Sequence, residues 1–260
     1  MSAFSDRYGP WALIAGASEG LGAAYARSLA SRGLNVLLVA RREAELTKFA
    51  AEVREQFRVE VKTLCLDLSE PTAAARVLEA SAGLQLGLMV FNAAFSPRGA
   101  FVEVSVESAL KAVDLNVRTC VELTHGISKR LVSQHRGGLL FLSSLTASAG
   151  SPFLATYGAT KSFTANFADA LWVELEPHGV DVLAVLAGAT RTPGFEKAAP
   201  DGAPGLLEPA VVAERSLDAI HRGPRFVPGA FNRFASLMMS LMPARSRLAL
   251  MADQTKKLKS

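Results

Sequence analysis

Three side chains near the middle of the chain have the types and the spacing that proton transfer requires. Tyr157 and Lys161 are four residues apart, so a helix places them on one face. A lysine ammonium beside a tyrosine favours the phenolate and lowers a pKa that is ordinarily about 10, which lets the phenol exchange a proton near neutral pH. Ser144 ends an earlier apolar run, and its hydroxyl can hydrogen-bond a substrate oxygen and stabilise charge developing there. These three residues form the predicted catalytic group.

A glycine-rich turn lies near the start of the chain. Gly16, Gly20 and Gly22 follow the apolar run Trp11–Ala15 and open an amphipathic segment. Glycines permit a tight turn and a close approach of the backbone to a ligand, and the helix that follows directs free N–H groups at a phosphate. The GxxxGxG spacing therefore predicts a dinucleotide site, with a plain strand-to-helix turn as the alternative.

The type of dinucleotide is indicated by Arg41 and Arg42, at the end of the second apolar run. A site for NAD usually has an acidic residue here, which accepts hydrogen bonds from the ribose hydroxyls. Two guanidiniums instead suit a 2′-phosphate, which adds a charge of about −1.5 to −2 and offers oxygens for forked contacts. We expect NADP(H), with Arg41 as the main ligand. The alternative is that both arginines only solvate the start of the next helix.

The elements that must position these residues alternate along the chain. Short apolar runs predict strands over Trp11–Ala15, Asn35–Ala40, Val61–Leu66, Leu86–Asn92, Gly138–Ser143, Val180–Leu186 and Arg225–Val227. Amphipathic segments predict helices over Leu21–Arg32, Glu43–Phe57, Pro71–Ala82, Val106–Gln134, Thr156–Glu176 and Pro209–His221. Continuous apolar strands are typical of a parallel sheet buried on both faces. The pattern predicts an α/β, doubly wound, Rossmann-type fold of about seven strands flanked by helices on both faces, with ligands at the carboxyl ends of the strands.

The composition excludes several other classes of protein. Half of the 260 residues are hydrophobic and 20% are charged, which argues against intrinsic disorder. The four histidines are dispersed and no CxxC pair is present, so no metal site is expected, and Cys65 and Cys120 are interpreted as buried free thiols. Neither a signal peptide nor a membrane-spanning segment is predicted, which favours a cytoplasmic protein.

The formal charge of +4 is concentrated at the C-terminus. Residues 1–243 carry 23 basic and 23 acidic side chains, whereas residues 244–260 carry five basic and one acidic. Residues 1–243 are therefore interpreted as one catalytic domain and 244–260 as a basic tail, and nucleic acid is not expected as a partner. The apolar segment Phe231–Met242 precedes the tail, and it could pack on the domain or a partner, cover the substrate entrance, or make a weak peripheral membrane contact.

These motifs together resemble the short-chain dehydrogenase/reductase family over about residues 8–195. The three glycines match its phosphate turn, Tyr157-Gly-Ala-Thr-Lys161 matches its YxxxK element, and Ser144 falls at the family's serine position. The resemblance implies that Asn116 is the fourth member of a catalytic tetrad and holds a water that links the lysine to a proton relay. It also implies a homodimer or homotetramer.

The resemblance assigns further cofactor contacts. Asp67 matches the position that contacts adenine, Asn92 the second asparagine of the NNAG element, and Thr192 the threonine that contacts the nicotinamide carboxamide. The complete set of cofactor residues that we expect is Gly16, Ser18, Gly20, Leu21, Gly22, Arg41, Arg42, Asp67, Leu68, Asn92, Ala93, Tyr157, Lys161, Gly188, Thr190 and Thr192.

Four positions depart from the family pattern. Ala15 replaces a threonine whose hydroxyl ties the turn to the fourth strand, Phe91-Asn-Ala-Ala94 replaces NNAG, and Ala187-Gly188 replaces Pro-Gly. Glu19 stands where many NADPH-preferring members have a basic residue, which weakens the expectation of NADP(H). None of these changes touches the tetrad, so we interpret the chain as an atypical but active reductase.

The expected reaction is hydride transfer between NADP(H) and a carbonyl or alcohol. The Tyr-Gly before the first strand, the Leu-Gly before the fourth and the apolar C-terminal segment are similar to the long-chain and steroid-type ketoreductase branch. The irregular residues 188–209, with four prolines and four glycines, predict a lid. A hydrophobic substrate is predicted from apolar residues expected at the pocket: Ala94, Phe95, Ala149, Phe153, Leu154 and Phe195. The alternatives are a noncatalytic NADP(H)-binding regulator and, ranked lower, a nucleotide-sugar epimerase or dehydratase.

Overall fold

The computed structural model describes residues 3–199 and 202–256. Residues 200–201 of the predicted lid, and Lys257 and Lys259 of the predicted tail, lie outside the described residues.

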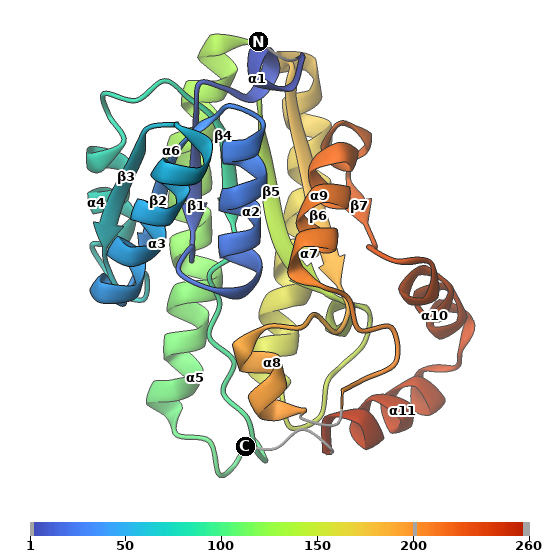
Figure 1. Ribbon diagram of the computed structural model, residues 1–260. Helices are drawn as coiled ribbons and strands as arrows, with labels where there is room; N and C mark the ends of the chain where they lie inside the picture. The colour runs from blue at the N-terminus through green and yellow to red at the C-terminus, as the bar shows by residue number, and fades with distance from the viewer. Residues whose placement is uncertain (1–2, 200–201, 257–260) are drawn as a thin grey trace.

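The described residues form a seven-stranded parallel sheet in the order β3-β2-β1-β4-β5-β6-β7 (Figure 1). The strands are β1 (Trp11–Ala15), β2 (Asn35–Ala40), β3 (Val61–Cys65), β4 (Leu86–Phe91), β5 (Gly137–Ser144), β6 (Val180–Ala187) and β7 (Arg225–Phe226). The order reverses between β1 and β4, and this reversal is the switch point at which such sheets open a ligand crevice. The predicted doubly wound fold is confirmed.

Helices cover both faces of the sheet. Successive residues of each strand point to opposite faces, and because both sets are apolar, both faces must be buried. Ala12 and Ile14 of β1 pack in one cluster with α2 (Gly20–Ser31), α3 (Glu43–Phe57) and α9 (Pro209–Ala219). Trp11 and Leu13 pack in the other cluster with α4 (Ala73–Ala80), α6 (Thr119–Gln134) and α7 (Ala155–Leu175). The strands are thus held between two apolar layers, and their carboxyl ends share one edge of the molecule.

The long helix predicted over Val106–Gln134 is interrupted. It begins as α5 (Val106–Val113), widens into a π-helical turn over Asp114–Arg118 and continues as α6. A π turn is less favourable than continuous α-helix and is common at functional sites. Asn116, in the middle of this turn, is almost completely buried.

Four α-helices of the described residues were not among the helices predicted from the sequence. An N-terminal helix α1 (Ala3–Tyr8) covers one end of the sheet, and α8 (Pro193–Ala198) lies inside the predicted lid. The apolar segment forms α10 (Ala230–Leu241), and the predicted tail is helical as α11 (Ala244–Lys256), with Met251 buried. Within the described ranges, no helix has the length and apolar character needed to cross a bilayer.

The cysteines differ from the expectation in one respect. Both are free and Cys120 is buried, but Cys65 is exposed. Cys65 lies at the end of β3, which forms the edge of the sheet and has exposed positions along its length. The prediction of a buried Cys65 was wrong because an apolar run does not reveal whether its strand is central or at an edge.

Candidate active site

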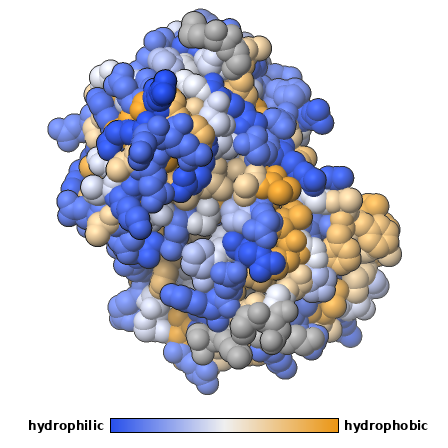
Figure 2. Space-filling model, in the orientation of Figure 1, coloured by the Kyte–Doolittle hydropathy of each residue, from blue (hydrophilic) through white to orange (hydrophobic). Residues whose placement is uncertain are grey.

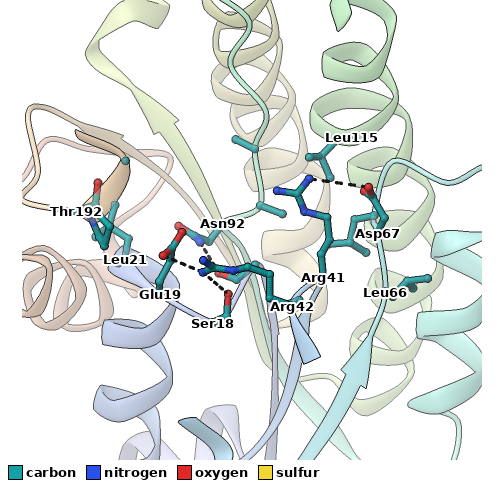
Figure 3. Close-up of a pocket in the computed structure, with 18 residues that line it drawn as sticks. Ser18, Glu19, Leu21, Arg41, Arg42, Leu66, Asp67, Asn92, Leu115 and Thr192 are labelled. Atoms are coloured by element: carbon teal, nitrogen blue, oxygen red, sulfur yellow. Dashed lines mark hydrogen bonds and ion pairs between the residues drawn. The ribbon is translucent and has the colours of Figure 1, made fainter. Parts of the chain in front are cut away.

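A cleft of about 340 Å³ opens at the switch point, beyond the carboxyl ends of β1, β2 and β4. Figure 3 shows the residues around it. The cleft is lined by Gly16, Ser18, Glu19, Gly20, Leu21, Ala40, Arg41, Arg42, Leu66, Asp67, Leu68, Asn92, Ala93, Ala94, Leu115, Thr192, Pro193 and Gly194.

The glycine turn forms one wall, and its glycines are required by space as well as by conformation. Gly16 has φ +84°, and a Cβ there would lie 2.8 Å from the backbone of Ala93. A Cβ on Gly22 would lie 1.8 Å from the Gly16 carbonyl oxygen, so no other residue fits without moving the turn. Glu19 is the N-cap of α2, but its side chain does not cap the helix. The first N–H groups of α2 are thus left to face the cleft.

The turn is tied to β4 without the hydroxyl that Ala15 lacks. The backbone N–H groups of Asn92 and Ala93 both donate to the Ala15 carbonyl, at 3.0 and 2.8 Å. The side-chain amide of Asn92 donates to the Gly16 carbonyl at 2.7 Å. One asparagine therefore anchors the phosphate turn, and the departure at Ala15 removes no essential contact.

Two arginines at the cleft are paired with three carboxylates. Arg42 forms an ion pair with Glu19 at 2.8 Å, and its guanidinium is 3.7 Å from Glu45. Arg41 is 57% exposed and only loosely paired, at 3.9 Å from Asp67. The Glu19 carboxylate raises the pKa of Arg42, so that guanidinium is charged and engaged while the other is free to turn.

Asp67 is held by neighbours that the sequence did not reveal. Its carboxylate accepts hydrogen bonds from the backbone and hydroxyl of Ser69 and from Lys111 on α5, the last at 3.1 Å. Burial works against ionisation, but these bonds outweigh it and keep the pKa of Asp67 below its usual value. Lys111 is far from Asp67 in the sequence, and no motif marks it.

Most of the predicted cofactor residues line the cleft, and the others lie around it. Gly22 lies behind the turn, Gly188 lies against Asn232 of α10, and Thr190 donates to the Gly188 carbonyl at 3.1 Å. Tyr157 and Lys161 lie outside the cleft lining, with the tetrad. Ala94, which was expected at the substrate pocket, also lines the cleft. The lining residues that were not predicted each adjoin a predicted residue in the sequence: Glu19, Ala40, Leu66, Leu115, Pro193 and Gly194.

The lid is more regular than its composition indicates. Thr190 and Leu207 form a parallel bridge, and Arg191 is ion-paired with Glu208 at 2.6 Å. Thr192 caps α8 by accepting a hydrogen bond from the Phe195 backbone. These contacts tie the two ends of the predicted lid segment together, and Thr192 lines the cleft.

The residues of the predicted tetrad lie close to one another, outside the cleft lining. The Lys161 side chain is buried and donates to the Leu142 carbonyl of β5 at 2.6 Å, with its nitrogen 5.6 Å from the centre of the Tyr157 ring. The Asn116 amide donates to the Phe95 carbonyl and to the Thr160 hydroxyl, both at 2.9 Å. The carboxyl end of β5, helix α7 and the π turn thus bring Ser144, Tyr157, Lys161 and Asn116 to one place.

The pKa of Tyr157 is raised, not lowered as the lysine at position 161 led us to expect. Burial raises the pKa of Tyr157, although a hydrogen bond with Ser144 and the charge of Arg98 act in the opposite direction. Burial lowers the pKa of Lys161 to about 8. Because its pKa is raised, Tyr157 is neutral at pH 7, and the neutral phenol is the form that donates a proton.

The residues of the cleft fit a dinucleotide with a 2′-phosphate. The tight turn that faces the cleft depends on Gly16 and Gly22, because a Cβ at either would meet the backbone of Ala93 or Gly16, and the uncapped start of α2 can direct its N–H groups at a pyrophosphate there. Arg41, with Arg42 beside it, would hold the 2′-phosphate, and Asp67 lies at the adenine end.

The chain is similar to known oxidoreductases over most of its length. The model of the short chain dehydrogenase family matches residues 10–202. A 7β-hydroxysteroid dehydrogenase of Collinsella aerofaciens is 35% identical over 215 residues, which cover 82% of this chain and 82% of that protein.

Two solved structures extend the similarity to the fold. One is of a 7β-hydroxysteroid dehydrogenase, with a TM-score of 0.91 at 30% identity, covering 95% of this chain and 98% of the other. The second is a short-chain dehydrogenase from Sphingobium yanoikuyae in complex with NADPH, with a TM-score of 0.79 at 29% identity, covering 93% and 95%.

Proposed function

This chain belongs to the short-chain dehydrogenase family, and we propose that it reduces a bulky hydrophobic ketone of steroid-like size, or oxidises the matching alcohol. It is an NADP(H)-dependent oxidoreductase that transfers a hydride between the nicotinamide and a carbonyl or alcohol carbon. The observation that carries the substrate proposal is the superposition on a 7β-hydroxysteroid dehydrogenase over 95% of the chain. The relatives do not favour a noncatalytic regulator or a nucleotide-sugar epimerase.

The surroundings of the tetrad support a hydrophobic substrate. Phe153 has φ +63° and accepts a hydrogen bond from the Gly99 backbone at 3.0 Å, which joins the loops that follow β4 and β5. Helix α11 packs on the same loop, with Leu248 against Gly150 and the Lys256 nitrogen 5.8 Å from the centre of the Phe153 ring. These contacts support a place for the C-terminal segment beside the loop after β5, where it would help to enclose a substrate.

In the proposed mechanism, Tyr157 donates its proton to the carbonyl oxygen while Ser144 hydrogen-bonds and orients that oxygen. The nicotinamide, when bound, supplies or accepts the hydride. Lys161 holds the nicotinamide ribose and stabilises the phenolate that Tyr157 becomes, and Asn116 supports the relay that returns a proton. Oxidation of the alcohol uses the same groups in reverse.

The arginines lead to a prediction about cofactor choice. We expect Arg41→Ala to weaken NADPH binding about 10- to 100-fold, because a charged hydrogen-bonded contact to the 2′-phosphate is lost, and to leave NADH binding nearly unchanged. Arg42→Ala should have the smaller effect, since Arg42 is engaged by Glu19. Fluorescence titration with each dinucleotide measures both. Arg76→Ala, which removes an exposed arginine outside the cleft, is the control. Equal losses for NADPH and NADH would contradict the assignment.

Substrate size is tested by following the loss of NADPH absorbance with three ketones: a steroid ketone, a long-chain aliphatic ketone and a small ketose. We expect kcat/KM to be highest for the steroid and at least about 100-fold lower for the ketose, because the apolar walls that we propose would give a sugar no partners for its hydroxyls. Comparable values for the ketose would refute the hydrophobic substrate but leave the reaction class intact.

Three further assignments concern the assembly, the membrane and the location of the protein. A homodimer or homotetramer is supported by exposed apolar residues on α5, namely Val106, Leu110 and Val113, and is checked by analytical ultracentrifugation. Hydrophobic side chains also gather over the region of α10 (Figure 2), and with the basic α11 they support a weak membrane contact that vesicle sedimentation would detect. A cytoplasmic location is checked by cell fractionation.

A further inference from the structure

Thr160, which lies between Tyr157 and Lys161 in the sequence, has a buried hydroxyl. Thr160 on α7 directly precedes Lys161 and is only 3% exposed. Its Oγ1 donates to the Tyr157 carbonyl oxygen at 2.8 Å and accepts a hydrogen bond from Asn116 Nδ2 at 2.9 Å. A hydroxyl has one proton, so the bond to Tyr157 uses its donor and leaves a lone pair directed at Asn116.

The amide of Asn116 is held in one orientation by this contact and two others. Its second N–H donates to the Phe95 carbonyl at 2.9 Å, and its Oδ1 accepts from the Phe95 backbone N–H at 2.8 Å. If the amide were flipped, its NH₂ group would face the Phe95 N–H and its oxygen would face the Phe95 carbonyl, and neither pair can form a hydrogen bond. Both amide protons are therefore committed, one to the loop after β4 and one to α7.

From this network we propose that Thr160 is a positioning residue for the reaction. Its hydroxyl fixes the amide of Asn116 and so joins three segments that meet only in the fold: the Phe95 loop, the π turn and helix α7. The proposal rests on the proposed function, because Asn116 and Tyr157 matter here as members of the tetrad. Without the hydroxyl, one amide proton is buried with no acceptor, and the amide must turn to find another.

A neighbouring threonine, Thr164, provides a control that distinguishes this role from the packing of a buried threonine. Thr164 lies one turn further along α7 and is also 3% exposed. Its hydroxyl donates to the Thr160 carbonyl at 2.9 Å, a local helix contact that reaches no member of the tetrad. Thr164→Val thus removes a hydroxyl of the same kind and burial from the same helix.

The test compares Thr160→Val, Thr160→Ser and Thr164→Val with the wild-type chain, using the ketone of the panel that the wild type reduces fastest. We expect Thr160→Val to lower kcat about tenfold while KM for NADPH stays within about twofold. The solvent isotope effect on kcat in D₂O should rise, because proton transfer becomes slower relative to the other steps. Thr160→Ser, which keeps the hydroxyl, should retain most of kcat, and Thr164→Val should match the wild type.

Several results would overturn the proposal. An unchanged kcat in folded Thr160→Val, an equal loss in Thr164→Val, or a loss in Thr160→Ser as large as in the valine variant would each show that the hydroxyl does not act through Asn116. Should the valine variant fail to fold, Thr160→Ala is measured in its place against the same expectations. Retained turnover in Tyr157→Phe would refute the tetrad itself, so failure of the proposed function is recognised separately.

Discussion

Replacing Tyr157 with phenylalanine should abolish turnover while leaving NADPH binding almost unchanged. Phenylalanine keeps the ring, and with it the packing beside Lys161, whose nitrogen is 5.6 Å from the ring centre. Only the phenolic hydroxyl is lost, so no side chain is left in position to donate a proton to the carbonyl oxygen of the substrate. We expect kcat to fall at least about 1,000-fold, within the range attributed to positioned acid–base groups.

Two measurements distinguish the loss of the proton donor from a general loss of structure or cofactor binding. NADPH affinity, measured without substrate, should stay within about twofold of the wild type, since a lost ring hydroxyl at most costs one modest contact. Tyr25→Phe is the matched control, because Tyr25 is fully buried in the opposite core cluster and is far from any predicted role in the reaction. Turnover near the wild-type rate in Tyr157→Phe would refute the assignment of Tyr157 as proton donor.

A single methyl group on Gly22 should eliminate cofactor binding. Alanine ordinarily stabilises a helix by about 1 kcal/mol relative to glycine. Here the added Cβ would lie 1.8 Å from the Gly16 carbonyl oxygen and 2.8 Å from the Asn92 amide nitrogen. The turn must open, and we expect Gly22→Ala to lower the free energy of unfolding by about 1–3 kcal/mol, the usual cost of overpacking.

The consequence for binding should be larger, because the displaced turn no longer directs its N–H groups at the pyrophosphate. We expect NADPH affinity to fall at least about 100-fold, the loss of two or more hydrogen bonds to charged groups. Gly83→Ala is the control, because a Cβ at Gly83 meets nothing within 4 Å. Thermal unfolding and fluorescence titration measure the two effects, and a Gly22→Ala chain with wild-type stability and affinity would contradict the geometry.

The sequence was most informative where one local pattern requires one local structure. Continuous apolar runs separated by amphipathic segments require a parallel sheet, and the glycine turn after β1 places the cleft at the switch point. The four-residue spacing of Tyr157 and Lys161 survives because both lie on one uninterrupted helix. These features depend on contacts within short stretches, and the structure has them as predicted.

Features that depend on distant contacts were missed. The ion pair of Glu19 with Arg42 joins two turns that follow different strands, and Lys111 reaches Asp67 from helix α5, far along the sequence. The π turn at Asn116 is stabilised by bonds to Phe95 and Thr160, so its own residues give no signal of it. The helical course of 244–256 likewise follows from packing of Met251 against the domain.

The strand order has a consequence for how activity arises during synthesis of the chain. β1 pairs with β2 on one side and on the other with β4, which follows much later in the sequence, so the phosphate turn is completed only after a long stretch has left the ribosome. Thr192 and the helix α7 come later still. A nascent chain therefore gains the phosphate turn first, the proton-transfer residues second and Thr192 of the cleft last. No contiguous half of the chain holds all three, so the complete site forms only when most of the chain has been made.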